Sequence, residues 1–260
     1  MTERLLIDRL SVRFGGLQAL REVSMVIQPG EIRGLIGPNG AGKTTLINAI
    51  TGMVSPDAGR VLLNGRDVTA MPAHQVSRQG ILRTFQHVEP FAEMSVLDNV
   101  LIGIGRHRPV GFFRAAFRTP AAVAAEKGNV DEAMAILERF GLASCARMPA
   151  TELPYGMLKR MDLARALAAR PALLLMDEPV SGMSEAEADE AINTARELAQ
   201  KQGITLLVIE HNMRVMMSFA QRVTVMQNGG VIAEGTPAEI QSNPQVIDAY
   251  LGQEESDAAH

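Results

Sequence analysis

Short apolar segments separated by turn residues fill the first third of the chain, a pattern typical of β-strands. Pro29 and Gly30 supply a turn before one such segment, and Asn64 with Gly65 favours a hairpin turn after another. The chain therefore begins as a β-rich region. The extended segments that this pattern predicts are residues 5–14, 23–27, 32–36, 61–63 and 80–85.

The middle of the chain, from about residue 95 to 170, has a helical pattern. Apolar stripes at this spacing are far more often core than cofactor contacts, although a helical insertion could also offer its outer face to a partner. The basic, irregular stretch at 106–120 is expected to be a solvated surface loop. One helix face carries the apolar residues Val130, Ala133, Met134, Leu137 and Phe140.

The last third alternates strands with helices, which is the rhythm of a mostly parallel sheet in an α/β fold. A helix is expected from about residue 185, and two capping boxes mark helix starts. The expected strands are residues 173–177, 205–210, 222–226 and 231–233, and the boxes are Ser184 with Glu187, and Thr236 with Pro237 and Glu239.

Composition narrows the class of protein. The 260 residues are 47% hydrophobic and 21% charged, which suits an ordinary globular chain. The net charge of -4 lacks the basic excess that is typical of proteins that bind nucleic acid non-specifically. The single cysteine, Cys145, cannot form an internal disulfide, and the N-terminal segment does not resemble a secretion signal. We therefore expect a cytosolic protein whose membrane role, if any, runs through partners, because the apolar runs are too short to span a bilayer.

A glycine-rich loop carries the strongest chemical signal. Residues 37–45, GPNGAGKTT, match the phosphate-binding pattern GxxxxGK[ST] between an apolar strand and an apolar helix. Lys43 is expected to bridge the β- and γ-phosphates of ATP, and the Thr44 hydroxyl to bind Mg²⁺. The nucleotide-binding residues predicted here are Gly37, Pro38, Asn39, Gly40, Ala41, Gly42, Lys43, Thr44 and Thr45.

Two acids follow the apolar run at 173–176. In a phosphate-loop enzyme the first, Asp177, supports magnesium and the second, Glu178, polarises the attacking water. An acid pair in this position is often structural, but its combination with the loop at 37–45 favours catalysis.

The segment LPYGMLKRMDLARALAARP at 153–171 makes the chain resemble the ATP-binding subunits of ABC transporters over nearly its whole length. The family's signature, LSGGQ, closes over the ATP of the opposite subunit. Here that signature reads Leu153, Pro154, Tyr155, Gly156 and Met157, so Pro154 removes a hydroxyl and an amide donor, and Met157 replaces an amide side chain.

The resemblance assigns three further positions. Phe14 stands where the family stacks an aromatic ring on adenine, although a core phenylalanine at a strand end is an equal alternative. Gln86 corresponds to the glutamine that touches magnesium, and His211 to the histidine near the γ-phosphate. Lys43, Glu178 and His211 are therefore the expected catalytic residues, and Thr44, Gln86 and Asp177 the expected metal-binding ones.

Segments flanking this core resemble the ATPases of branched-chain amino acid importers, among them RTFQ with EMSVLDNVLIG, and NPQVIDAYLG. The resemblance implies one ABC ATPase domain at 1–252 with a phosphate-loop α/β fold, an N-terminal antiparallel β subdomain, a helical subdomain at about 87–170 and a polar tail at 253–260. It implies a second ATPase subunit, membrane permeases and an external solute-binding protein as partners, at the cytoplasmic face of the membrane. The alternatives are an ATPase of a related urea or amide system or of another ABC system, and a weakly hydrolysing regulatory module of the ABC type.

Overall fold

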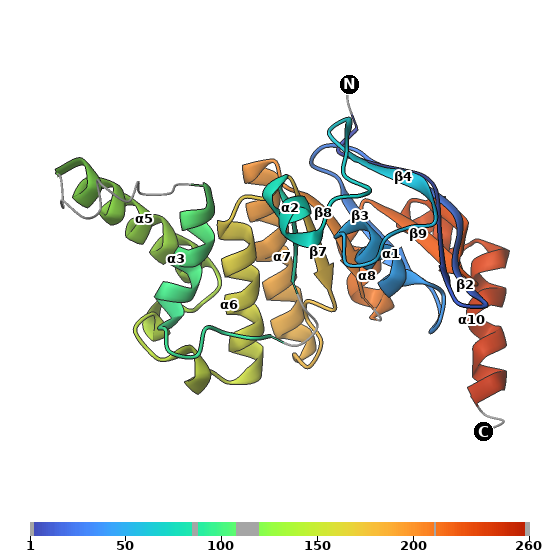
Figure 1. Ribbon diagram of the computed structural model, residues 1–260. Helices are drawn as coiled ribbons and strands as arrows, with labels where there is room; N and C mark the ends of the chain where they lie inside the picture. The colour runs from blue at the N-terminus through green and yellow to red at the C-terminus, as the bar shows by residue number, and fades with distance from the viewer. Residues whose placement is uncertain (1–2, 85–87, 108–119, 211, 258–260) are drawn as a thin grey trace. The chain divides into compact units, whose positions relative to one another are not determined.

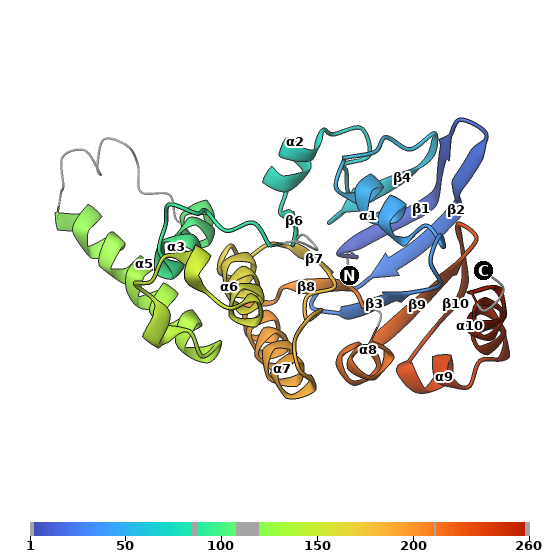
Figure 2. The same ribbon diagram turned by 90° about the horizontal axis from the view of Figure 1, so that it is seen from below.

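The computed structural model describes residues 3–84, 88–107, 120–210 and 212–257, and the chain divides into two compact units (Figure 1, Figure 2). Unit 1 comprises Met1–Arg83, Ala172–Glu178 and Gly203–His260, and unit 2 comprises Thr84–Pro171 and Pro179–Gln202. No helix within the described residues is both long enough and apolar enough to cross a membrane.

In the described part of unit 1 the strands form two sheets. One sheet is antiparallel, with the order β2-β1-β4-β5, and the other has the order β10-β9-β3-β8-β7-β6. In the second sheet every neighbouring pair is parallel except β10 with β9. The strands are β1 Leu5–Phe14, β2 Leu17–Ile27, β3 Ile32–Ile36, β4 Ala58–Leu63, β5 Arg66–Asp67, β6 Ile81–Arg83, β7 Leu173–Asp177, β8 Thr205–Ile209, β9 Arg222–Gln227 and β10 Gly230–Gly235.

The core of unit 1 joins both sheets through helix α1, Lys43–Ile50. Leu46, Ile47 and Ile50 of this helix are almost completely buried and pack in the same cluster as apolar residues of β1, β2, β3, β7 and β8. The buried face of α1 therefore anchors the loop that precedes it. The other helices of this unit are α2 Ala73–Arg78, α8 Met213–Phe219, α9 Pro237–Gln241 and α10 Pro244–Asp257.

Unit 2 is helical, as the sequence pattern predicts for this region. Its helices are α3 Val96–His107, α5 Pro120–Arg139, α6 Tyr155–Ala168 and α7 Glu185–Gln202, with 3-10 turns at Ala143–Cys145 and Ala150–Glu152. Ala133, Leu137 and Phe140 of the predicted apolar stripe are buried and Val130 and Met134 are partly buried, so the stripe faces the core. Gly103 lets α3 approach α6, because a Cβ there would lie 2.3 Å from the carbonyl oxygen of Arg165.

Several local predictions are confirmed. Asn64 and Gly65 both have positive φ, 50° and 77°, in the turn between β4 and β5. The Thr236 hydroxyl accepts from the amide of Glu239 at the start of α9, and the Ser184 hydroxyl accepts from the amide of Glu187 near the start of α7. The strand in the expected segment 80–85 is shorter than predicted, since β6 spans Ile81–Arg83; residue 85 lies outside the described residues.

Strand β2 is longer than the predicted segment at 23–27, because it begins at Leu17. Its first half is interrupted by Glu22, whose φ of 46° matches the φ of 47° at Arg9 on β1, where the register of the pair shifts. The amide of Arg9 donates to the Ser24 hydroxyl, and that of Glu22 to the Ser11 hydroxyl, both at 3.0 Å. These facing bulges hide the simple alternation that marks a strand in the sequence.

Candidate functional site

The parallel register of unit 1 brings three strand ends to one edge of the six-stranded sheet. Leu35 of β3 and Asp177 of β7 both pair with Ile209 of β8. The residues that follow these strands are therefore neighbours, since carboxyl ends of parallel strands lie at the same edge. They are the loop at 37–42, the acid Glu178 and Glu210.

The glycine-rich loop has a backbone that depends on its glycines. Gly37, Gly40 and Gly42 have φ values of 149°, 76° and 100°, which favour glycine over residues with a side chain. Gly37 is also wedged against β9, because a Cβ there would lie 2.1 Å from the carbonyl oxygen of Met226. The loop leads directly into the N-terminus of α1, where free amides and the helix dipole favour an anion.

Lys43 curls back into this loop. Its Nζ donates to the carbonyl oxygens of Gly37 at 2.6 Å and Pro38 at 2.9 Å, and the residue is only 9% exposed. Burial lowers the pKa of Lys43, and the negative charges of Glu178 and Asp177 oppose that shift. A buried ammonium is thus held by two carbonyl oxygens of the loop, close enough to Glu178 and Asp177 to feel their charges.

The remaining loop residues differ in exposure. Pro38 and Ala41 are buried, whereas Asn39, Gly40 and Thr44 are exposed and Thr45 is partly buried. Thr44 lies in the first turn of α1, directly after the loop. This exposure suits a residue that meets a ligand and not the core.

Asp177 is the last residue of β7, and its Oδ2 accepts from Nη2 of Arg83 at 2.8 Å. Glu178 follows in a left-handed conformation, with a φ of 48°, which costs a non-glycine residue about 1–2 kcal/mol. Its amide donates to the carbonyl oxygen of Ile209 at 2.9 Å, a bond that fixes the turn. Strain of this kind gathers at functional sites, and here it redirects the second acid away from the strand.

The oxygen donors fit magnesium. Asp177 offers a carboxylate and Thr44 a hydroxyl, the ligand types that Mg²⁺ takes together with substrate phosphates and water. The described residues hold no cluster of three or more His, Cys, Asp or Glu side chains that could bind a metal by themselves. Such a site depends on the nucleotide to complete it.

Phe14 ends β1 and is 50% exposed, so it is not a core residue at a strand end. Its ring is open to solvent at the turn where Phe14 pairs with Leu17. The alternative of a core phenylalanine is thereby wrong, and stacking on adenine stays a prediction.

The five signature residues lie at the start of α6 in unit 2. Pro154 is the N-cap residue and offers no side-chain cap, while Leu153 is 8% exposed and Tyr155 48% exposed. The Tyr155 ring packs on Gly182, whose φ is 78° and where a Cβ would lie 2.8 Å from the ring. A Cβ at Gly156 would make only ordinary contacts, with Glu187 and Met183. The contact of Met157 with ATP stays a prediction.

Two predicted site residues, Gln86 and His211, lie outside the described residues, as does most of the basic stretch at 106–120. Two other residues at the site are absent from the sequence predictions. Arg83 contacts Asp177, and Tyr250 of α10 reaches the loop, where burial raises the pKa of its hydroxyl and a hydrogen bond with the Gly37 backbone opposes the shift. A basic residue at the end of a short apolar strand was the only local signal for Arg83.

The sequence matches two family models. Residues 20–181 match the ABC transporter model, and residues 231–256 match the model of the branched-chain amino acid ATP-binding cassette transporter. Together they span the loop, the acid pair and the C-terminal helix α10.

Similar proteins cover almost all of the chain. The high-affinity branched-chain amino acid transport ATP-binding protein LivG of Salmonella typhimurium is 41% identical over 249 residues, which is 96% of this chain and 98% of that protein. BraF of Pseudomonas aeruginosa, with the same description, is 37% identical over 95% of this chain and 97% of its own. A solved structure of the ADP conformation of an ATP-binding cassette of an ABC transporter has a TM-score of 0.80 and 36% identity, and covers 97% of this chain and 100% of that one.

Proposed function

The chain belongs to the ABC transporter family of ATP-binding proteins, and from this we propose that it hydrolyses ATP to power an importer of branched-chain amino acids. The observation that carries the proposal is the buried Lys43 inside the loop at 37–42, beside Asp177 and Glu178. The 41% identity to LivG over 96% of the chain supports branched-chain amino acids as the transported solutes. An ABC-type ATPase with this site needs a nucleotide, and ATP is the one the family binds.

The chemistry follows from the positions of these residues. Loop amides and Lys43 receive the β- and γ-phosphates, and the ammonium offsets charge that grows on the transferred group. Thr44, Gln86 and Asp177 would hold magnesium, which would supply further positive charge to the phosphates. Glu178 polarises the water that attacks the γ-phosphorus. The bond from that phosphorus to the ADP oxygen breaks, so the products are ADP, inorganic phosphate and a proton. His211 is assigned to the γ-phosphate.

We further propose that the active form is a head-to-tail dimer in which Phe14 stacks on adenine and each ATP meets the opposite subunit's signature. Pro154 and Met157 lack the hydroxyl and amide groups of a regular signature, which supports a partner ATPase that supplies a better one. A homodimer would contain two weakened sites, whereas a heterodimer would contain one good site. The heterodimer is therefore our preferred assembly.

The ATPase rate tests this assembly. It is measured for the chain alone, with the related ATPase encoded beside it, and for the chain with Pro154→Ser and Met157→Gln together. We expect a higher rate with the partner and a rise in the rate of the lone chain when the signature is restored. An unmodified lone chain as active as the mixture, with no gain from the restored signature, contradicts the heterodimer.

We also propose where the chain acts and which other transporter subunits it serves. The ATPase domain at 1–252, with its helical subdomain at about 87–170 and its polar tail at 253–260, acts at the cytoplasmic face of the membrane. Permease subunits carry the solute, which an external binding protein delivers, and no nucleic acid is involved.

Cargo is tested in cells that lack their own branched-chain amino acid ATPases but express this chain with its permeases and binding protein. Uptake of labelled leucine, isoleucine and valine should return with the wild-type chain and not with Lys43→Met. Uptake of urea or a short amide in place of these amino acids would assign the chain to the related transport systems.

A further inference from the structure

Arg83 ends the edge strand β6, which pairs in parallel with β7. The register sets Arg83 opposite Leu175, two residues before Asp177, so its side chain points along the sheet edge toward the carboxylate. Nη2 donates to Asp177 Oδ2 at 2.8 Å, and the two side chains are only 12% and 13% exposed. The attraction between two charges that are this sheltered is screened less by water and salt than the attraction in an exposed ion pair.

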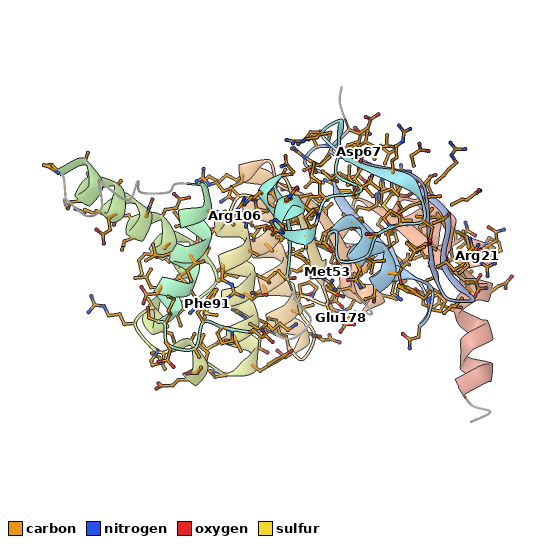
Figure 3. The ribbon with its side chains drawn as sticks, in the orientation of Figure 1. Arg21, Met53, Asp67, Phe91, Arg106 and Glu178 are labelled. Carbon is orange, nitrogen blue, oxygen red and sulfur yellow. The ribbon has the colours of Figure 1, made fainter. Side chains whose placement is uncertain are left out.

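The other arm of the same guanidinium reaches helix α1. Nη1 donates to Oδ1 of Asn48 at 2.7 Å and lies 3.8 Å from the sulfur of Met53, which follows α1 and is labelled together with Glu178 in Figure 3. Because α1 begins with Lys43, Arg83 ties the acid of β7 to the helix that carries the phosphate-binding ammonium.

The chemistry of arginine suits this link. Its planar fork presents donors at fixed angles, so one arm cannot move without the other, whereas a lysine ammonium at the same place would be a point charge on a flexible stem. Groups that fix the orientation of a metal-binding carboxylate usually change metal affinity about 10–100-fold when they are removed.

We propose that Arg83 is a positioning residue of the ATP site: it holds the Asp177 carboxylate at a set place relative to α1, where that carboxylate meets the magnesium of bound MgATP. This rests on the proposed function, since it assigns Asp177 to the metal. A purely structural ion pair would affect nucleotide binding equally with and without magnesium. A positioning residue affects only the magnesium-dependent part.

The experiment measures the Kd of a non-hydrolysable ATP analogue twice, in excess EDTA and in excess Mg²⁺, and takes the ratio. Arg83→Met removes both arms and Arg83→Lys keeps the charge without the fork. Arg66→Met is the matched control. Arg66 of β5 donates an exposed hydrogen bond at 2.7 Å to Gln79, the C-cap residue of α2, and this bond does not involve Asp177. Thermal melting without nucleotide reports folding.

In Arg83→Met the gain in affinity from Mg²⁺ should shrink about tenfold or more, with the Kd in EDTA nearly unchanged. The gain in affinity from Mg²⁺ in Arg83→Lys should lie between those of the wild type and Arg83→Met. The gain in Arg66→Met should equal that of the wild type. An unchanged ratio overturns the proposal, and so does a larger ratio, which would mean that the guanidinium competes with the metal.

If Arg83→Met does not fold, Asn48→Leu replaces it, since it breaks only the link to α1. The gain in analogue affinity from Mg²⁺ must then be smaller in that variant than in the wild type, and an unchanged gain overturns the proposal. A wild-type chain that binds the analogue in neither buffer would instead refute the ATP site itself.

Discussion

Replacing Lys43 by methionine removes the charge at the centre of the site and keeps most of the side chain's volume. Because Lys43 is 9% exposed in the folded chain, its desolvation is already part of the folded state and is not repeated when ATP binds. Two opposite unit charges about 4 Å apart attract by roughly 4 kcal/mol at an effective dielectric constant of about 20. Loosening the bonds to Gly37 and Pro38 offsets about 1 kcal/mol of this.

The net loss of about 3 kcal/mol corresponds to a Kd for ATP that is roughly 100-fold higher. Equilibrium titration with a fluorescent ATP analogue measures this, and Lys201→Met, at an exposed position near the end of α7, is the control. A Kd within about threefold of wild type for Lys43→Met would refute the assignment, because about 100-fold is expected.

The lowered pKa of Lys43 adds two checks. Its protonated form is disfavoured by burial, so the fold gains stability as pH rises through the lowered pKa, and Lys43→Met should melt no lower than the wild type without nucleotide. ATP affinity should change in the opposite sense, since binding needs the ammonium, and should fall as pH rises through that pKa. In Lys43→Met this pH dependence should disappear, and its persistence would point to another group.

The remaining predictions concern the acid, the core and the signature. Glu178→Gln should bind MgATP but hydrolyse it at least about 100-fold more slowly, since it loses the charge that polarises water; normal turnover would move the base elsewhere. Arg33→Met should lower the free energy of unfolding, measured in urea, by about 3–5 kcal/mol. Arg33 is 3% exposed, and its loss leaves the buried Glu31 carboxylate, 2.6 Å away, without its ion-pair partner. A smaller effect would mean that water reaches Glu31. Gly182→Ala should displace the Tyr155 ring and lower partner-stimulated ATPase activity with ATP affinity unchanged; full stimulation would show that the ring's place is unimportant.

Local chemistry explains why much of the site could be predicted from sequence. Gly37, Gly40 and Gly42 occupy backbone conformations that favour glycine, so their spacing is visible in the chain itself. Asp177 likewise follows an uninterrupted apolar strand. Both signals can therefore be recognised from neighbouring residues in the sequence.

Other features depend on contacts between distant segments. Arg83 matters because β6 lies beside β7, and the register of two parallel strands is not written in either one. The bulges at Arg9 and Glu22 need hydroxyls from the opposite strand, so the sequence pattern does not reveal the first half of β2. The left-handed turn at Glu178 is fixed by a carbonyl of β8, and no propensity favours glutamate there.

We propose above all that ATP turnover by this chain drives import of a branched-chain amino acid. Proteoliposomes that contain the permeases, the partner ATPase and this chain, with the binding protein on the opposite side of the membrane from the ATPases, allow accumulation of labelled leucine to be measured directly. We predict accumulation with ATP on the ATPase side, none with ADP, and none when the chain carries Lys43→Met. Leucine accumulation that is independent of ATP, or unchanged by Lys43→Met, would contradict the account.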